Sequence, residues 1–114
     1  APRYERRHHR HIHGIRGLEW INLTEEQINE INKIDYDYET KIREAEYRKR
    51  GVDYKFEYER EKADINLKTI KDLINQRKDI EKEIDYLRIE REVSIFNVLT
   101  AEQREQINRI RYYR

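Results

Sequence analysis

Leu23-Thr24-Glu25-Glu26-Gln27 and Leu99-Thr100-Ala101-Glu102-Gln103 are two copies of one pattern, Leu-Thr-x-x-Gln, which we call the LTxxQ motif. The match continues past the fifth residue, because Ile-Asn-x-Ile follows each copy at the same offset, as residues 31–34 and 107–110. A single copy is a common pattern. Two copies that agree over this length predict related structures at the two ends of the helical part of the chain.

Each copy has the residues of a helix N-terminus. A Thr and a Gln three positions apart form a capping box, in which the two side chains bond to each other's backbone N–H groups. Glutamates in the first turn of each helix, Glu25, Glu26 and Glu102, are favoured by the helix dipole. We therefore expect each cap to stabilise its helix by about 1 kcal/mol. The predicted cap and motif residues are Leu23, Thr24, Gln27, Leu99, Thr100 and Gln103.

The apolar residues between the motifs recur every three or four positions, which predicts helices. The first helix runs from Thr24 to about Arg50, and its stripe is Ile28, Ile31, Tyr38, Ile42, Ala45, Val52 and Phe56, interrupted by Asp35 and Lys49. Gly51 either ends this helix, with Asp53 capping a second one, or lies inside one continuous helix at a cost of about 1 kcal/mol. Asp64 is the expected cap of a long helix to about Val98, and Thr100 caps the last helix, to about Tyr112.

The composition predicts a thin core. Charged residues make up 43% of the 114 positions and hydrophobic residues 36%, yet the apolar positions keep helical spacing. The expected fold is all-α, an elongated four-helix hairpin-type protomer that needs a second copy to bury its apolar stripes. The chain has no cysteine, so neither a disulfide nor a thiolate metal site is possible. No apolar run approaches the roughly 18 residues of a membrane span.

Two parts of different character are expected along the chain. Residues 1–17 form a basic, His-containing arm, in which five arginines and one glutamate give 5 − 1 = +4, against +1 for the whole chain. Gly14, Gly17 and the lack of periodicity predict that this arm is flexible. Residues 18–114 then form a single helical domain, against which a patch of Leu18, Trp20 and Ile21 docks the arm.

Two LTxxQ motifs that frame long helices resemble those of the Spy/CpxP family of bacterial periplasmic proteins. The resemblance covers residues from about 18 to 114. Residues 21–27 are similar to the family's first motif, and residues 75–78 and 95–104 are similar to the end of its third helix and to its second motif. The basic stretch with histidines ahead of the first motif also resembles several members. Spy-type members are the most similar.

The resemblance implies a curved antiparallel homodimer, shaped as a cradle. It implies an ATP-independent chaperone of the stress response, which holds unfolded or partly folded client proteins on its concave face and suppresses their aggregation. It also implies the periplasm, with Ala1 as the start of a mature chain after signal-peptide removal, although a trimmed chain would begin in the same way. CpxP-type members inhibit an envelope-stress sensor kinase, and other relatives bind zinc, nickel or cobalt.

The client surface is expected to use different side chains in this chain. Spy-type members have methionines there, whereas this chain has no Met and nine Tyr. One helical face alternates aromatic and cationic groups, which can hold many sequences weakly: Tyr36, Arg43, Tyr47, Arg50, Tyr54 and Tyr58. Packing of these tyrosines at a dimer interface or over the helix hairpin is equally open. In a purely structural coiled-coil module, Tyr47→Ala and Tyr54→Ala disturb dimerisation rather than activity.

The four histidines, His8, His9, His11 and His13, all lie in the arm. The alternating spacing of His9, His11 and His13 lets an extended or looped chain direct several imidazoles at one zinc, nickel or copper ion. The alternative function is therefore a metal-binding periplasmic stress sensor or adaptor. A solvated basic tail or the remnant of an affinity tag explains the same residues, and the chaperone function requires no cofactor.

No enzyme is predicted. The chain has no glycine-rich phosphate loop and no cysteine, and its one serine, Ser94, has no histidine near it in the sequence. Nucleic acid is not an expected partner either, because the chain beyond the arm is slightly acidic and carries no nucleic-acid-binding motif. The expected partners are client proteins and a second copy of the chain.

Overall fold

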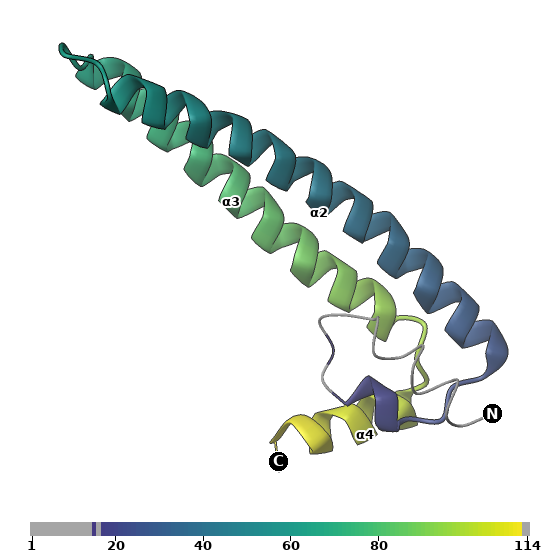
Figure 1. Cartoon of the computed structure of the whole chain (residues 1–114). Helices are drawn as coiled ribbons and strands as arrows, with labels where there is room; N and C mark the ends of the chain where they lie inside the picture. The colour runs from purple at the N-terminus through teal and green to yellow at the C-terminus, as the bar shows by residue number, and fades with distance from the viewer. Residues whose placement is uncertain (1–14, 16, 113–114) are drawn as a thin grey trace. The chain divides into compact units, whose positions relative to one another are not determined.

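The computed structural model describes residues 15 and 17–112, which form helices and contain no strand (Figure 1). In chain order come the short 3-10 helix η1 (Leu18–Trp20) and the α-helices α2 (Glu25–Arg60), α3 (Leu67–Phe96) and α4 (Ala101–Tyr112). The prediction of an all-α fold is confirmed. The described residues contain three α-helices rather than four, because the two segments on either side of Gly51 are joined.

Gly51 lies inside α2, so the structure has the continuous helix of the two alternatives. α2 contains 36 residues and ends at Arg60 instead of at Arg50. Ala45 and Val52 are buried on either side of this point. Their burial outweighs the roughly 1 kcal/mol that an internal glycine costs a helix.

The helices begin at both LTxxQ motifs as predicted, α2 at Glu25 and α4 at Ala101. The start of α3 differs, because the cap is Asn66 and not Asp64. Asn66 Oδ1 accepts the backbone N–H of Thr69 at 3.1 Å, and the N–H of Asn66 donates to Glu59 Oε2 at 3.0 Å. Glu59 thus ties Asn66 to the end of α2, which places the cap two positions later than the sequence predicts. α3 ends at Phe96, close to the predicted end.

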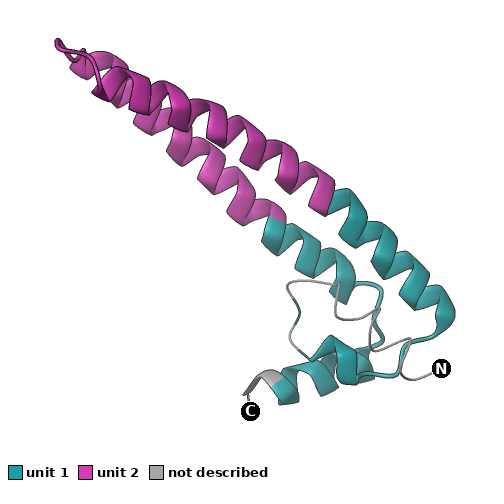
Figure 2. Cartoon of the chain, in the orientation of Figure 1, with its two compact units in different colours: residues 1–38, 88–114 teal, residues 39–87 magenta. Residues whose placement is uncertain are grey.

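The chain divides into two compact units (Figure 2). Unit 1 comprises residues 1–38 and 88–114, and unit 2 comprises residues 39–87. α2 and α3 both contribute to each unit, and each unit has its own cluster of buried side chains. The predicted boundary between an arm over residues 1–17 and one domain over residues 18–114 stays a prediction, since residues 1–14 and 16 lie outside the described part.

The core of unit 1 draws on η1 and on all three α-helices. Its buried members are Ile15, Leu18, Ile21, Ile31, Ile95, Leu99 and Ile107. Full burial of an aliphatic side chain of this size stabilises the fold by about 1.5–3 kcal/mol. Of the patch predicted to dock the arm, Leu18 and Ile21 are buried, whereas Trp20 is 61% exposed.

The core of unit 2 is thinner. Ile42 and Ala45 of α2 pack against Ile84 of α3, with Ile80 and Leu87 partly buried beside them. Ion pairs cross from α2 to α3 in this unit, among them Arg48–Glu83, Lys49–Glu81 and Arg77–Asp53. Their side chains are all partly exposed, so these pairs contribute to the register of the two helices more than to stability.

Candidate functional site

The two LTxxQ motifs contact each other in unit 1. Gln27 Nε2 donates to Gln103 Oε1 at 2.8 Å, and Gln103 Nε2 donates to Gln27 Oε1 at 3.2 Å. Each amide also donates to the carbonyl just before the other motif, from Gln27 to Val98 O at 3.2 Å and from Gln103 to Asn22 O at 2.8 Å. A local pseudo-two-fold symmetry therefore relates the two copies.

Each glutamine also closes the capping box of its own motif, as predicted. The N–H of Thr24 donates to Gln27 Oε1 at 2.9 Å, and the N–H of Gln27 donates to Thr24 Oγ1 at 3.1 Å. Thr100 and Gln103 make the same two bonds at the same distances. Every donor and acceptor of the two amides is thus used. Because Leu99 is buried and Leu23 packs on the same core, the motif residues act as one structural unit.

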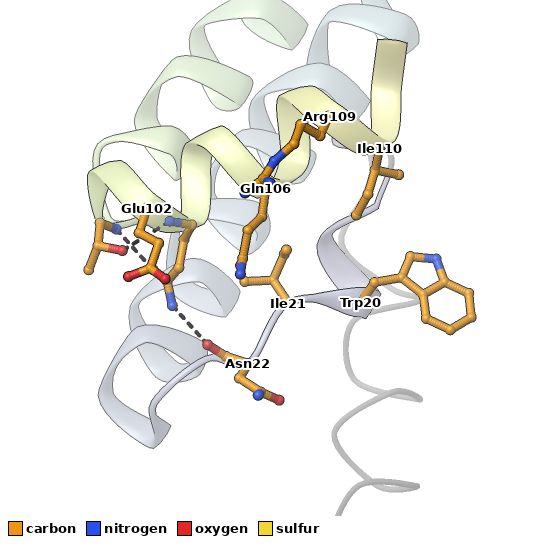
Figure 3. A pocket seen from close by; sticks show the side chains of 9 residues that line it. Trp20, Ile21, Asn22, Glu102, Gln106, Arg109 and Ile110 are labelled. Atoms are coloured by element: carbon orange, nitrogen blue, oxygen red, sulfur yellow. Dashed lines mark hydrogen bonds between the residues drawn. The ribbon is translucent and has the colours of Figure 1, made fainter. Parts of the chain in front are cut away.

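An open hollow of about 660 Å³ lies beside the second motif (Figure 3). It is lined by Trp20, Ile21, Asn22, Thr100, Glu102, Gln103, Gln106, Arg109 and Ile110. These residues come from η1 and the segment after it, and from α4 and its cap. Arg109 and Glu102 are its two charged groups and have opposite signs, so the lining has no net charge.

A buried ion pair joins α2 and α3 inside unit 1. Arg91 Nη1 lies 3.6 Å from Asp35 Oδ1, and the two side chains are 6% and 13% exposed. In the sequence, Asp35 interrupts the apolar stripe of the first helix. Arg91 lies four residues from each of two apolar residues, Leu87 and Ile95, and so interrupts an apolar stripe of α3. Opposite charges within two apolar stripes are the signal that predicts such a pair.

The predicted Tyr/Arg face is exposed. Tyr47, Tyr54 and Tyr58 are 71%, 78% and 70% exposed, and Arg43 and Arg50 are exposed as well. These five residues belong to unit 2, and helix geometry places them within an arc of about 80° on α2. The remaining member, Tyr36, is 69% exposed and belongs to unit 1. The alternative in which these tyrosines pack over the hairpin is therefore wrong, while packing against a second copy stays open.

The cations on this face have different neighbours. Arg43 Nη2 lies 3.5 Å from Glu39 Oε2. Arg50 Cζ lies 5.7 Å from the centroid of the Tyr47 ring, a cation–π contact, and makes no ion pair with any residue that the structure describes. Arg50 therefore presents an exposed guanidinium that contacts an aromatic ring and forms no ion pair with a described carboxylate.

Tyr54 and Tyr58 also line a groove of about 810 Å³ at the end of unit 2 where α2 and α3 are connected. We call it the hairpin groove, and its lining is Tyr54, Lys55, Glu57, Tyr58, Glu59, Glu61, Thr69 and Leu73. Leu73, which is buried, supplies an apolar surface from α3. The sequence did not predict the contribution of Thr69 and Leu73, because the pairing of α3 with the end of α2 depends on where the connecting turn ends.

Glu59 holds this connection together. It is 5% exposed, and its carboxylate accepts the N–H of Asn66 at 3.0 Å and Lys62 Nζ at 3.0 Å. The hydrogen bond from Asn66 above all, and then that from Lys62, hold the pKa of Glu59 below its ordinary value, and burial opposes them. Glu59 is therefore a charged anchor of the turn between α2 and α3.

The predicted metal ligands His8, His9, His11 and His13 lie outside the described residues. Within residues 15 and 17–112, no three side chains of His, Cys, Asp or Glu are grouped so that they could hold a metal ion. The metal site therefore stays a prediction. None of the described helices has the length and apolar character needed to cross a membrane.

Comparisons of the chain with models of known protein families, with curated proteins and with solved structures find no match. A function is therefore inferred from the motifs and surfaces of the chain itself.

Proposed function

We propose that this chain is an ATP-independent periplasmic chaperone that holds unfolded or partly folded proteins on the Tyr/Arg face of α2. The observation that carries the proposal is the exposure of Tyr47, Tyr54 and Tyr58 beside Arg43 and Arg50. Aromatic side chains that are grouped and exposed on one surface are typical of interaction sites. The resemblance of the two LTxxQ motifs to those of the Spy/CpxP family supports the same function and compartment.

The chemistry of the face suits weak and reversible holding. A tyrosine ring offers apolar contact at a low cost in side-chain entropy, and its hydroxyl tolerates water or a polar partner. Arginine attracts carboxylates over several ångströms and stacks on aromatic rings. Because the tyrosines stand on an open helix face, a client is retained by many weak contacts and keeps its mobility.

A second copy of the chain is part of the proposal, as a curved antiparallel homodimer. In unit 1, Ile89 and Val93 of α3 are 59% and 52% exposed and lie one helical turn apart. Exposed aliphatic side chains of this size are the kind that a homodimer interface covers. Tyr36 is the one member of the predicted client face in unit 1. A client can reach it only if the second copy of the chain leaves Tyr36 uncovered in the dimer.

The test is the aggregation of a chemically denatured protein, with and without this chain at one dimer per client, without ATP and with a chelator. We expect suppression of aggregation. A variant with both Tyr47→Ala and Tyr54→Ala is expected to lose most of this effect. Tyr86→Ala is the matched control, because Tyr86 is 66% exposed in unit 2 but belongs to α3. Sedimentation velocity on each variant reports whether dimerisation is unchanged.

Three outcomes speak against the proposal in different ways. Aggregation that continues with chelator and stops with added zinc favours the metal-binding stress sensor or adaptor that uses the arm histidines. A double tyrosine variant that becomes monomeric but still suppresses aggregation places Tyr47 and Tyr54 at the dimer interface. Absence of suppression under every condition favours a purely structural module.

A further inference from the structure

The hairpin groove and Arg50 are neighbours on α2 with complementary chemistry. Arg50 precedes Tyr54 by four residues and Tyr58 by eight, which places it about 6 Å and 12 Å from them along the helix axis. All three residues belong to unit 2. One bound segment can therefore reach both the guanidinium and the groove.

Two of the four charged residues that line the hairpin groove are paired within the chain, and the other two, Lys55 and Glu61, have opposite signs. Glu59 is paired with Lys62, whose ammonium also lies 5.3 Å from the ring of Tyr58. Glu57 is paired with Arg60 at 3.3 Å. The groove is thus left with its apolar surface, from the Tyr54 and Tyr58 rings and Leu73, as its main attraction for a ligand.

Arg50 is different, because its charge is not matched by any described carboxylate. The guanidinium makes a cation–π contact with the Tyr47 ring, which leaves its charge open to an anionic partner. A carboxylate is the group that a guanidinium binds best among protein side chains. The surface therefore pairs one anchor for an acidic group with one groove for an apolar group.

We propose that unit 2 recognises extended client segments in which an Asp or Glu lies two to four residues from an aromatic or large aliphatic residue. The carboxylate contacts Arg50, and the apolar side chain enters the hairpin groove between Tyr54, Tyr58 and Leu73. The interval follows from the distances above, because an extended chain advances about 3.3 Å per residue. This inference rests on the proposed chaperone function and names the class of segment that the same face binds.

Fluorescence anisotropy of labelled peptides, titrated with the full chain, tests the signature. The parent peptides carry Glu-x-x-Phe or Phe-x-x-Glu in a Gly/Ser background, since the direction of the bound segment is not specified. In the better of the two, Glu→Lys is expected to weaken binding about fivefold, and high salt should remove most of that difference. Phe→Ala is expected to weaken binding about tenfold at either salt concentration.

A charge reversal on the protein locates the site. Arg50→Glu is expected to invert the preference, so that the Lys peptide binds more tightly than the Glu peptide. Lys71→Glu is the matched control: Lys71 is exposed in unit 2, and helix geometry places it on the far side of α3 from Thr69 and Leu73. This variant changes the net charge equally and is expected to keep the parent preference. Tyr54→Ala in the protein should weaken binding of the parent Phe peptide and leave binding of the Phe→Ala peptide unchanged.

Equal affinity for the Glu and Lys peptides, or an unchanged preference in Arg50→Glu, overturns the inference. If aggregation is suppressed while the peptides show no preference, the chaperone proposal stands and the signature fails. If the peptides bind with the expected preference while no client is protected from aggregation, the signature stands and the chaperone proposal fails.

Discussion

The side-chain amides of Gln27 and Gln103 bind each other reciprocally, although 76 positions separate them in the chain. Each amide also caps its own helix and donates to the carbonyl just before the other motif. Each LTxxQ motif is therefore at once a helix cap and one half of a long-range contact. The sequence repeat corresponds to a local symmetry in space.

Removal of either glutamine should destabilise the fold, because the amide of the other glutamine then loses hydrogen-bond partners. We expect Gln27→Ala and Gln103→Ala each to lower the free energy of unfolding by about 2–4 kcal/mol. The double variant should cost about 1–2 kcal/mol less than the sum, since the second substitution removes groups already without partners. Urea unfolding followed by circular dichroism measures all three. Gln76→Ala, at an exposed position of α3, is the control and should change stability by less than about 0.5 kcal/mol.

Gly17 is required where the chain enters η1. Its φ is +93°, and a Cβ added there would lie 2.9 Å from Ile110 Cγ2. We expect Gly17→Ala to destabilise the chain by about 1–3 kcal/mol, from backbone strain and from contact with α4. In an Ile110→Ala background the contact part of that cost should fall, because Cγ2 and Cδ1 are removed while Cβ stays 3.3 Å away, and the backbone strain should remain. A thermal melt of Gly17→Ala that matches the parent would contradict this role.

Local features of the fold could be predicted from the sequence because they depend on nearby residues. The caps at Thr24 and Thr100 follow from the spacing to Gln27 and Gln103, and both were found as expected. The cap of α3 could not be chosen by the same reasoning, since Asp64 and Asn66 are both good caps. The choice depends on Glu59, which reaches Asn66 from the end of a different helix.

The candidate sites also include contacts between different helices, which the sequence alone did not predict. Helical periodicity predicted which tyrosines share a face of α2, and their exposure agrees with an interaction surface. Periodicity did not predict that Leu73 of α3 joins Tyr54 and Tyr58 in the hairpin groove, or that Asp35 meets Arg91. Both depend on the register between α2 and α3, which many side chains along the pair decide together.

Removal of one member of the buried pair of Asp35 and Arg91 should strongly destabilise the fold. Replacement of both by apolar residues should destabilise it much less. Arg91→Met alone removes a cation beside the buried Asp35 carboxylate, and we expect a loss of about 3 kcal/mol or more. A double variant with Asp35→Leu and Arg91→Met should recover most of that loss, because an apolar pair avoids the desolvation of both charges. Chemical denaturation of the single and double variants measures the difference. A double variant as unstable as Arg91→Met would mean that the pair is needed for packing as well as for charge.

Substitution of Gly51 by alanine is expected to change the stability of the chain in the opposite direction from the same substitution at Gly17. Apart from the two chain neighbours and the backbone of the helix itself, no atom lies within 4 Å of a Cβ added at Gly51, and the residue is helical. We expect Gly51→Ala to stabilise the chain by about 1 kcal/mol through helix propensity, raising Tm by about 4 °C. A lower Tm would show that the chain uses Gly51 as a helix end in solution.

Glu59 should make the stability of the chain depend on pH in the acid range. Hydrogen bonds from Asn66 and Lys62 hold its pKa in the folded chain below the ordinary value of 4.5. The unfolded chain therefore binds this proton more readily, so the contribution of Glu59 is complete above about pH 4.5 and is lost as pH falls through its folded pKa. Thermal melts of the parent and of Glu59→Gln should differ most near pH 7 and converge in strong acid. Glu61→Gln, at an exposed neighbouring position, is the control and should follow the parent at every pH. A difference between parent and Glu59→Gln that stays constant with pH would mean that Glu59 acts through its shape and not through its charge.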